Sequence, residues 1–376
     1  MREEGAVAFL AVLVLGVLVM VFCLVFASQK PAGGAGQGPS APAQMTAAQF
    51  WQGLAQRPPK YGTATYNCPV TGDQIDVPTL TERNAFGGIA TDLMEIMLMP
   101  PAEGRGRPEF DGQPWEKLLV TCPVSGATFM EADLFNLRQG LVPGGQERLK
   151  EWDLAAVAPS LAEVPSEEWT GDERAFVRYL TTRHAGFPDS ELGFYALHGA
   201  YVSNFAVWYG KDHVIPGAAF YALASAHLAR AFDEPLNDEA RAIVAMTRGE
   251  LRRLLGDQAG AQAMFALARE IYEDYLLTIE NQMQAAEAGN AMSVATKLHK
   301  RIASSLDVLT QLETLTAEED YFLSRAEVAG RPEPPVGWYI EEMLPAINGE
   351  LVADRGDWVA EDDPAVIVER ILELLP

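Results

Sequence analysis

The chain has 376 residues, and its formal charge of −24 comes from 52 acidic side chains against 28 Lys and Arg. This balance excludes the basic footprint that a nucleic-acid phosphate backbone needs, and it argues against an electrostatic hold on anionic lipid. The three cysteines, Cys23, Cys68 and Cys122, are too few for a disulfide-stapled scaffold.

The N-terminal segment predicts a membrane anchor. Residues 5–27 form an apolar run without a charge, which is long enough to cross about 30 Å of hydrocarbon as a helix. We therefore expect a single-pass transmembrane helix, with cleavage of a signal peptide after Ala27 as the alternative. The soluble part is expected on the extracytoplasmic side. Residues 29–45 are rich in Gly, Pro, Ala and Ser, which predicts a flexible linker.

A short motif, Cys-Pro-Val-x-Gly, begins at Cys68 and again at Cys122. A zinc knuckle is usually Cys-x-x-Cys, and two knuckles supply the four thiolates of one tetrahedral site. In this chain Thr71 and Ser125 stand where the second cysteine of each knuckle would be. Because a neutral hydroxyl is a poor zinc ligand, we predict a degenerate site without metal or other cofactor. Retained zinc, or a disulfide between the two cysteines, are the alternatives.

The region around the knuckles is predicted to be small and α+β. Each knuckle is expected at the tip of a β-hairpin, because a short apolar run leads into a Pro/Gly turn. We predict a helix at residues 90–99 and a strand at residues 117–120, which enters the second knuckle.

From residue 167 onward the sequence predicts a mainly α fold, because apolar residues recur at spacings of three and four. The expected helices lie at residues 170–182, 190–209, 216–232, 238–255, 258–277 and 291–315. A capping box at Thr316 predicts a further helix that Gly330 ends, and Pro364 begins a last helix that runs to Leu375.

Two of these helix pairs have the spacing of tetratricopeptide repeats. In the second pair, Gly249 allows close approach of the helices, residues 256–257 form the turn, and Phe265 fills the hollow between repeats. Small residues flank this aromatic at Ala261 and Ala268. The first pair follows a similar plan with Gly199, Ala219, Leu223 and Ala226. A plain helical bundle is the alternative.

The chain is expected to divide into five parts. They are a transmembrane anchor at residues 1–28, a linker at 29–45, a degenerate zinc-knuckle-like region at 46–150, a tetratricopeptide-like helical domain at 166–330 and a C-terminal helical extension at 331–376.

The two motifs together resemble an uncharacterised bacterial family, domain of unknown function 2225. The resemblance rests on the paired knuckles, on Cys-Pro-Val-Ser-Gly-Ala-Thr-Phe-Met-Glu-Ala-Asp-Leu from Cys122, and on Gly-Glu-Leu-Arg-Arg-Leu-Leu-Gly-Asp from Gly249. It covers residues 60–275. The family's fuller pattern has Cys-x-x-Cys in each knuckle, which implies a bound metal, and this chain departs from it at Thr71 and Ser125. The resemblance implies an architecture and supplies no reaction.

The sequence favours binding over catalysis. It contains no Gly-rich phosphate loop after a strand and no Gly-x-Ser-x-Gly elbow, so we expect no enzyme. His198 and His227 are expected as part-buried helix residues hydrogen-bonded nearby, with metal ligation beside the cysteines as the alternative.

The predicted function is a membrane-anchored protein-interaction module. Stacked helix pairs present a concave groove that suits an extended peptide or a partner helix. The candidate groove residues are Tyr201, Asn204, Glu250 and Arg253. The alternative is a metal- or redox-responsive domain based on the two knuckle cysteines.

Overall fold

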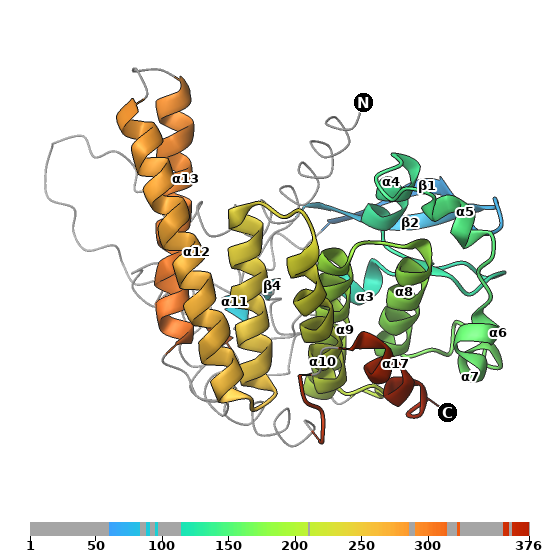
Figure 1. The fold of residues 1–376 in the computed structure, drawn as a ribbon. Helices are drawn as coiled ribbons and strands as arrows, with labels where there is room; N and C mark the ends of the chain where they lie inside the picture. The colour runs from blue at the N-terminus through green and yellow to red at the C-terminus, as the bar shows by residue number, and fades with distance from the viewer. Residues whose placement is uncertain are drawn as a thin grey trace, which may run out of the picture.

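The fold is described from a computed structural model (Figure 1). The described residues are 60–82, 88–90, 95–96, 114–209, 211–285, 290–313, 322–323, 356–360 and 363–375. They are mainly helical, with a small region of short β-sheets, as predicted. Within these ranges no helix has both the length and the apolar character needed to cross a bilayer. The predicted anchor and linker lie outside the described residues.

Both knuckles lie at the tips of antiparallel hairpins, which confirms the prediction. Strands β1 (Lys60–Asn67) and β2 (Gln74–Glu82) flank the first knuckle, and β5 (Val120–Thr121) and β6 (Thr128–Phe129) flank the second. The covered face of β2 contributes Val77, which is fully buried.

A third sheet joins distant parts of the chain. Strand β3 (Gly88–Ala90) pairs with β4 (Glu95–Ile96) on one side and with β7 (Phe322–Leu323) on the other, both antiparallel. The helices predicted at residues 90–99 and 316–330 are therefore wrong where the structure describes them. Strand pairing decides both segments: β4 pairs with the nearby β3, whereas β7 pairs with β3 from more than 200 residues away, and helical spacing shows neither pairing.

The strand predicted at residues 117–120 is also wrong over most of its length. Helix α3 (Pro114–Lys117) precedes β5, which includes only Val120 of the predicted strand. Leu118 and Leu119 between them are both 6% exposed, whereas a strand with one covered face would alternate.

Short helices surround the knuckles and longer helices form the rest of the described chain. The short ones are α4 (Glu131–Arg138), α5 (Gly145–Leu149), α6 (Leu154–Val157) and α7 (Pro159–Ala162). The longer ones are α8 (Gly171–Ala185), α9 (Asp189–Tyr209), α10 (Gly217–Arg230), α11 (Asp238–Leu254), α12 (Gln258–Ala285), α13 (Asn290–Leu312) and α17 (Pro364–Leu372). A 3₁₀ turn, η1 (Ala231–Asp233), follows α10.

Side-chain caps set the starts of several helices where the sequence predicted them. Thr170 accepts the N–H of Glu173 at 3.4 Å, and the Glu173 carboxylate accepts the N–H of Thr170 at 2.7 Å, which makes a capping box at α8. Asp363 caps α17 by accepting the N–H of Ala365 at 2.9 Å.

The long helices form two consecutive hairpins, α9/α10 and α11/α12, with α10 against α11 (Figure 1). Helix α8 packs on α9, and α13 packs on α12. A Cβ on Gly249 would lie 2.6 Å from the ring of Phe265, so the helices meet as closely as predicted. In the first hairpin a Cβ on Gly199 would overlap the ring of Phe220. The large residue of that pair is thus Phe220, three positions before the predicted Leu223.

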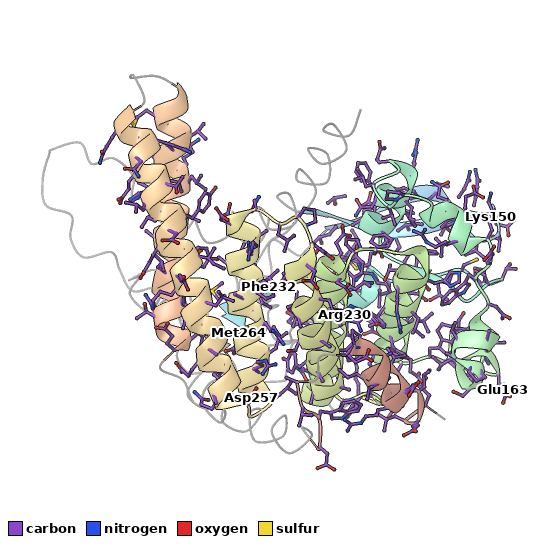
Figure 2. All side chains as sticks on the ribbon, viewed as in Figure 1. Lys150, Glu163, Arg230, Phe232, Asp257 and Met264 are labelled. Atoms are coloured by element: carbon purple, nitrogen blue, oxygen red, sulfur yellow. The ribbon has the colours of Figure 1, made fainter. Side chains whose placement is uncertain are left out.

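The turn between α11 and α12 is at residues 256–257, as predicted. Asp257, labelled in Figure 2, accepts the N–H of Gly260 at 2.9 Å and so caps α12. It also accepts a hydrogen bond from Arg252 at 2.6 Å.

One hydrophobic core links the knuckles to the helices. It runs from β2 and the knuckles through α8, α9 and α10 to α17, while a second core fills the space between α11, α12 and α13. Ile367 and Ile371 of α17 are fully buried in the first core. Arg230 of α10, labelled in Figure 2, donates a hydrogen bond to Asp363 at 3.0 Å. The described end of the predicted C-terminal extension is therefore part of the main body.

Candidate functional site

The two knuckles have the same backbone conformation. In each one the cysteine N–H donates to the carbonyl oxygen five residues later, at 2.7 Å for Cys68 and 2.8 Å for Cys122. The N–H groups of Gly72 and Gly126 donate back to the cysteine carbonyl oxygens at 2.8 and 2.9 Å. These glycines have φ values of +80° and +67°, a region that other residues rarely adopt. The repeated sequence motif is thus a repeated structure.

The hydroxyl groups at the fourth position of each knuckle motif also occupy equivalent places. Thr71 and Ser125 each accept the N–H of the residue two positions later, at 3.3 and 3.4 Å. The Thr71 hydroxyl lies 3.9 Å from the sulfur of Cys122 in the other knuckle. The two knuckles therefore face each other at this sulfur.

Cys68 and Cys122 are buried in the same hydrophobic core beneath the two knuckles. Both side chains are free thiols, and both are 1% exposed. Burial raises the pKa of Cys122, but hydrogen bonds from the Ser125 side chain, the backbone of Ser125 and Val124 and the Cys68 thiol outweigh burial and lower it.

Residues that follow β6 cover the second knuckle. The indole Nε1–H of Trp152 donates to the carbonyl oxygen of Ser125 at 3.1 Å. A Cβ on Gly126 would lie 2.6 Å from Leu154, so α6 packs directly on the turn. By contrast, Val124 at the tip is 73% exposed. The tip of the second knuckle is thus at the surface, although both cysteines are buried.

The donor set does not fit a tetrahedral zinc site. Two thiols and two neutral hydroxyls supply only half of the thiolates that such a site uses. In the part of the chain that the structure describes, no three His, Cys, Asp or Glu side chains are grouped so that they could hold a metal. A scan of protein-family models, a search of curated proteins and a search of solved structures each found no match to this chain.

The four predicted groove residues are in the interior. Tyr201 is 1% exposed, Asn204 6%, and Glu250 and Arg253 0%, so they do not line an open groove. Arg253 donates to both carboxylate oxygens of Glu250 at 2.8 and 2.7 Å. This bidentate pair offsets the desolvation free energy of burying the two charges. Both residues were predicted at the surface of a groove.

A buried polar network that the sequence reasoning missed connects the knuckle region to the helices. Arg178 of α8 donates to both carboxylate oxygens of Asp133 in α4, at 2.7 and 2.8 Å. Its guanidinium lies 4.1 Å from the ring centre of Tyr195 and 3.2 Å from His198 Nδ1. The Tyr195 hydroxyl donates to Glu191 at 2.9 Å. The sequence signal that indicates this network is Arg178 itself, a charged residue inside the apolar run Phe-Val-Arg-Tyr-Leu.

The histidines are hydrogen-bonded within the helical part, as expected. His227 bonds Asp189 through Nδ1 at 2.5 Å and Tyr179 through Nε2 at 2.7 Å. Burial lowers the pKa of His227, although Asp189 opposes this, and burial together with Arg178 holds the pKa of His198 well below its usual range. A neutral His227 donates from Nδ1 to Asp189 and accepts from Tyr179.

Glu191 makes the stability of this network depend on pH. Burial raises its pKa to about 7, Asp133 and Glu234 add to this, and Tyr195 and Arg178 oppose it. Since the folded pKa exceeds the unfolded one, the contribution of Glu191 to stability is complete below about pH 4.3 and is lost as pH rises through 7.

We therefore predict that Glu191→Gln flattens the pH dependence of unfolding. From pH 5 to pH 8 the native chain should lose about 2 kcal/mol more stability than this variant, a figure reduced for partial exposure. Urea unfolding at several pH values measures the difference. Glu163→Gln, at an exposed site labelled in Figure 2, is the control and should keep the native slope. Equal slopes for Glu191→Gln and the native chain would contradict the prediction.

Proposed function

We propose that this chain is a membrane-anchored, non-enzymatic protein-interaction module. Residues 1–28 would be the anchor, and a tetratricopeptide-like array of helical hairpins would be the binding part. The observation that carries this proposal is a contact that both hairpins repeat, in which a helix glycine packs against a phenylalanine ring. Gly199 packs on Phe220 in α9/α10, and Gly249 packs on Phe265 in α11/α12. Repeated hairpins of this kind present extended surfaces that suit protein partners.

The partner surface that we favour is the α12–α13 hairpin. Helix α12 has 28 residues and α11 has 17, and Figure 1 shows α12 and α13 extending past the end of α11. On this extension Leu277 is 58% exposed and Val294 is 65% exposed. Exposed apolar side chains on a projecting helix pair suit a partner helix with an apolar face, so we place the partner there rather than at the buried groove residues.

Site-specific crosslinking tests this surface. A photoreactive residue at position 277 or 294 of the full chain, expressed in its native membrane, should crosslink one defined protein, and Leu277→Glu together with Val294→Glu should abolish its capture. Both side chains are exposed, so we expect circular dichroism and the thermal midpoint to stay unchanged.

The matched control is position 124, where Val124 is 73% exposed on the second knuckle. A photoreactive residue there should not crosslink the same protein, and Val124→Glu should leave capture intact. Equal crosslinking from position 124, or capture that survives the double substitution, would rule out the α12–α13 surface.

A second candidate function is a redox response of the knuckle thiols, and it is favoured by two free cysteines buried in one core where the first knuckle reaches the Cys122 sulfur. The Cys122 thiolate would attack a small disulfide such as oxidised glutathione and expel one thiolate. Cys68, after losing its proton, would attack the Cys122 sulfur and release the second. Two protein thiols would thus become one disulfide as the small disulfide becomes two thiols. If two reactive thiols are still counted after treatment with oxidised glutathione, the redox function is excluded.

A further inference from the structure

The knuckle site offers a metal ion an unusual set of donors. The Cys122 sulfur lies 3.9 Å from the Thr71 hydroxyl of the other knuckle, and Cys68 and Cys122 are buried in one core, although the two cysteines lie far apart in sequence and on separate hairpins. The positions of a third and fourth thiolate hold the hydroxyl groups of Thr71 and Ser125. A metal ion at this point would therefore meet two sulfur donors and two weak, neutral oxygen donors.

Metal ions differ in whether two sulfur donors are enough. Structural Zn²⁺ requires four donors, and Ca²⁺ and Mg²⁺ require six or more oxygen donors. A soft monovalent ion such as Cu(I) or Ag(I) prefers thiolate sulfur and is satisfied by two such ligands. A site with two cysteines therefore prefers a different ion from a site with four, and it can still bind a metal ion.

We propose that Cys68 and Cys122 form a two-thiolate site for a soft monovalent cation of the Cu(I) class. Binding replaces two thiol protons, which leave to solvent, with one cation, so the loaded site carries a single negative charge. Neither sulfur changes oxidation state. The proposal uses the same two thiols as the redox function above, but it needs neither a disulfide nor a protein partner.

The surroundings of the sulfurs suit this charge. The Thr71 hydroxyl lies 3.9 Å from the Cys122 sulfur, and the neighbouring polar groups of Ser125 and Val124 lower the pKa of this thiol. Such donors stabilise a buried thiolate. Trp152 and Leu154 cover the second knuckle and limit the access of water and oxidants.

The test is an anaerobic titration of the reduced full chain carrying Cys23→Ser, so that Cys68 and Cys122 are its only thiols. Cu(I) is supplied from a chromophoric Cu(I) chelator, and Ag(I) serves as a probe without redox chemistry. We expect one Cu(I) per chain, protection of both thiols from alkylation, and two sulfur neighbours in X-ray absorption. Zn²⁺ should not bind stoichiometrically when measured with a zinc indicator.

Variants assign the ligands. Cys68→Ala or Cys122→Ala should each abolish the stoichiometric Cu(I), whereas Thr71→Val should keep one Cu(I) per chain. If an alanine variant does not fold, the sulfur count and thiol protection of the chain with both cysteines still decide the question. No Cu(I) uptake, stoichiometric Zn²⁺, fewer than two sulfur neighbours, or uptake that survives Cys68→Ala would each overturn the proposal.

Discussion

Replacing Asp133 by asparagine is expected to lower the free energy of unfolding by about 3–5 kcal/mol, because it leaves a buried arginine without its counter-charge. Arg178 and Asp133 have side chains 5% and 0% exposed, and no solvent can replace the lost carboxylate. Asp133 also accepts the N–H of Met130 at 2.7 Å at the start of α4, so the substitution weakens a helix cap as well.

Denaturant unfolding, followed by circular dichroism and by tryptophan fluorescence, measures this loss. The double variant Asp133→Leu with Arg178→Met removes both charges and should recover much of the stability. The matched control is Glu147→Gln, which breaks the exposed ion pair with Lys150 (Figure 2) and should cost less than about 1 kcal/mol. Similar losses for Asp133→Asn and Glu147→Gln would show that the buried pair has no special role.

Phe265→Ala is the second substitution with a large expected effect, a loss of about 3–5 kcal/mol. The Phe265 side chain is fully buried between α11 and α12, and its removal leaves a cavity against Gly249. Phe135→Ala, at a side chain 46% exposed on α4, is the control and should change stability by less than about 1 kcal/mol.

A double-mutant cycle with Gly249→Ala tests the packing itself. In the native background the new Cβ would lie 2.6 Å from the Phe265 ring, so the substitution should destabilise despite the better helix propensity of alanine. In the Phe265→Ala background the ring is absent, and the same substitution should cost less or stabilise. Additive effects would mean that glycine and ring do not constrain each other.

The sequence predicted well those features that depend on neighbouring residues. The hairpins at the knuckles and the turn at residues 256–257 follow from local turn chemistry, and the start of α8 follows from its apolar spacing. The contact of Gly249 with Phe265 was also predictable, because its spacing is that of a repeated helix pair.

Features that depend on distant partners could not be predicted in this way. Strand β3 pairs with residues more than 200 positions away, and no local pattern indicates that partner. Glu250 and Arg253 were predicted to line a partner-binding groove, yet they are fully buried as an ion pair three residues apart on one helix. In the candidate site, the motif predicted the two turns, and the structure shows that Thr71 of one knuckle lies 3.9 Å from the Cys122 sulfur of the other.

The salt bridge between Asp133 and Arg178 has a consequence for biogenesis. Arg178 leaves the ribosome 45 residues after Asp133, and α17, which completes the same core, follows much later. Because synthesis adds about 5–20 residues per second, several seconds pass between synthesis of the knuckle hairpins and synthesis of the helices that cover them. During that interval Cys68 and Cys122 are not yet sealed, and a metal donor or oxidant could reach them more readily than in the finished protein.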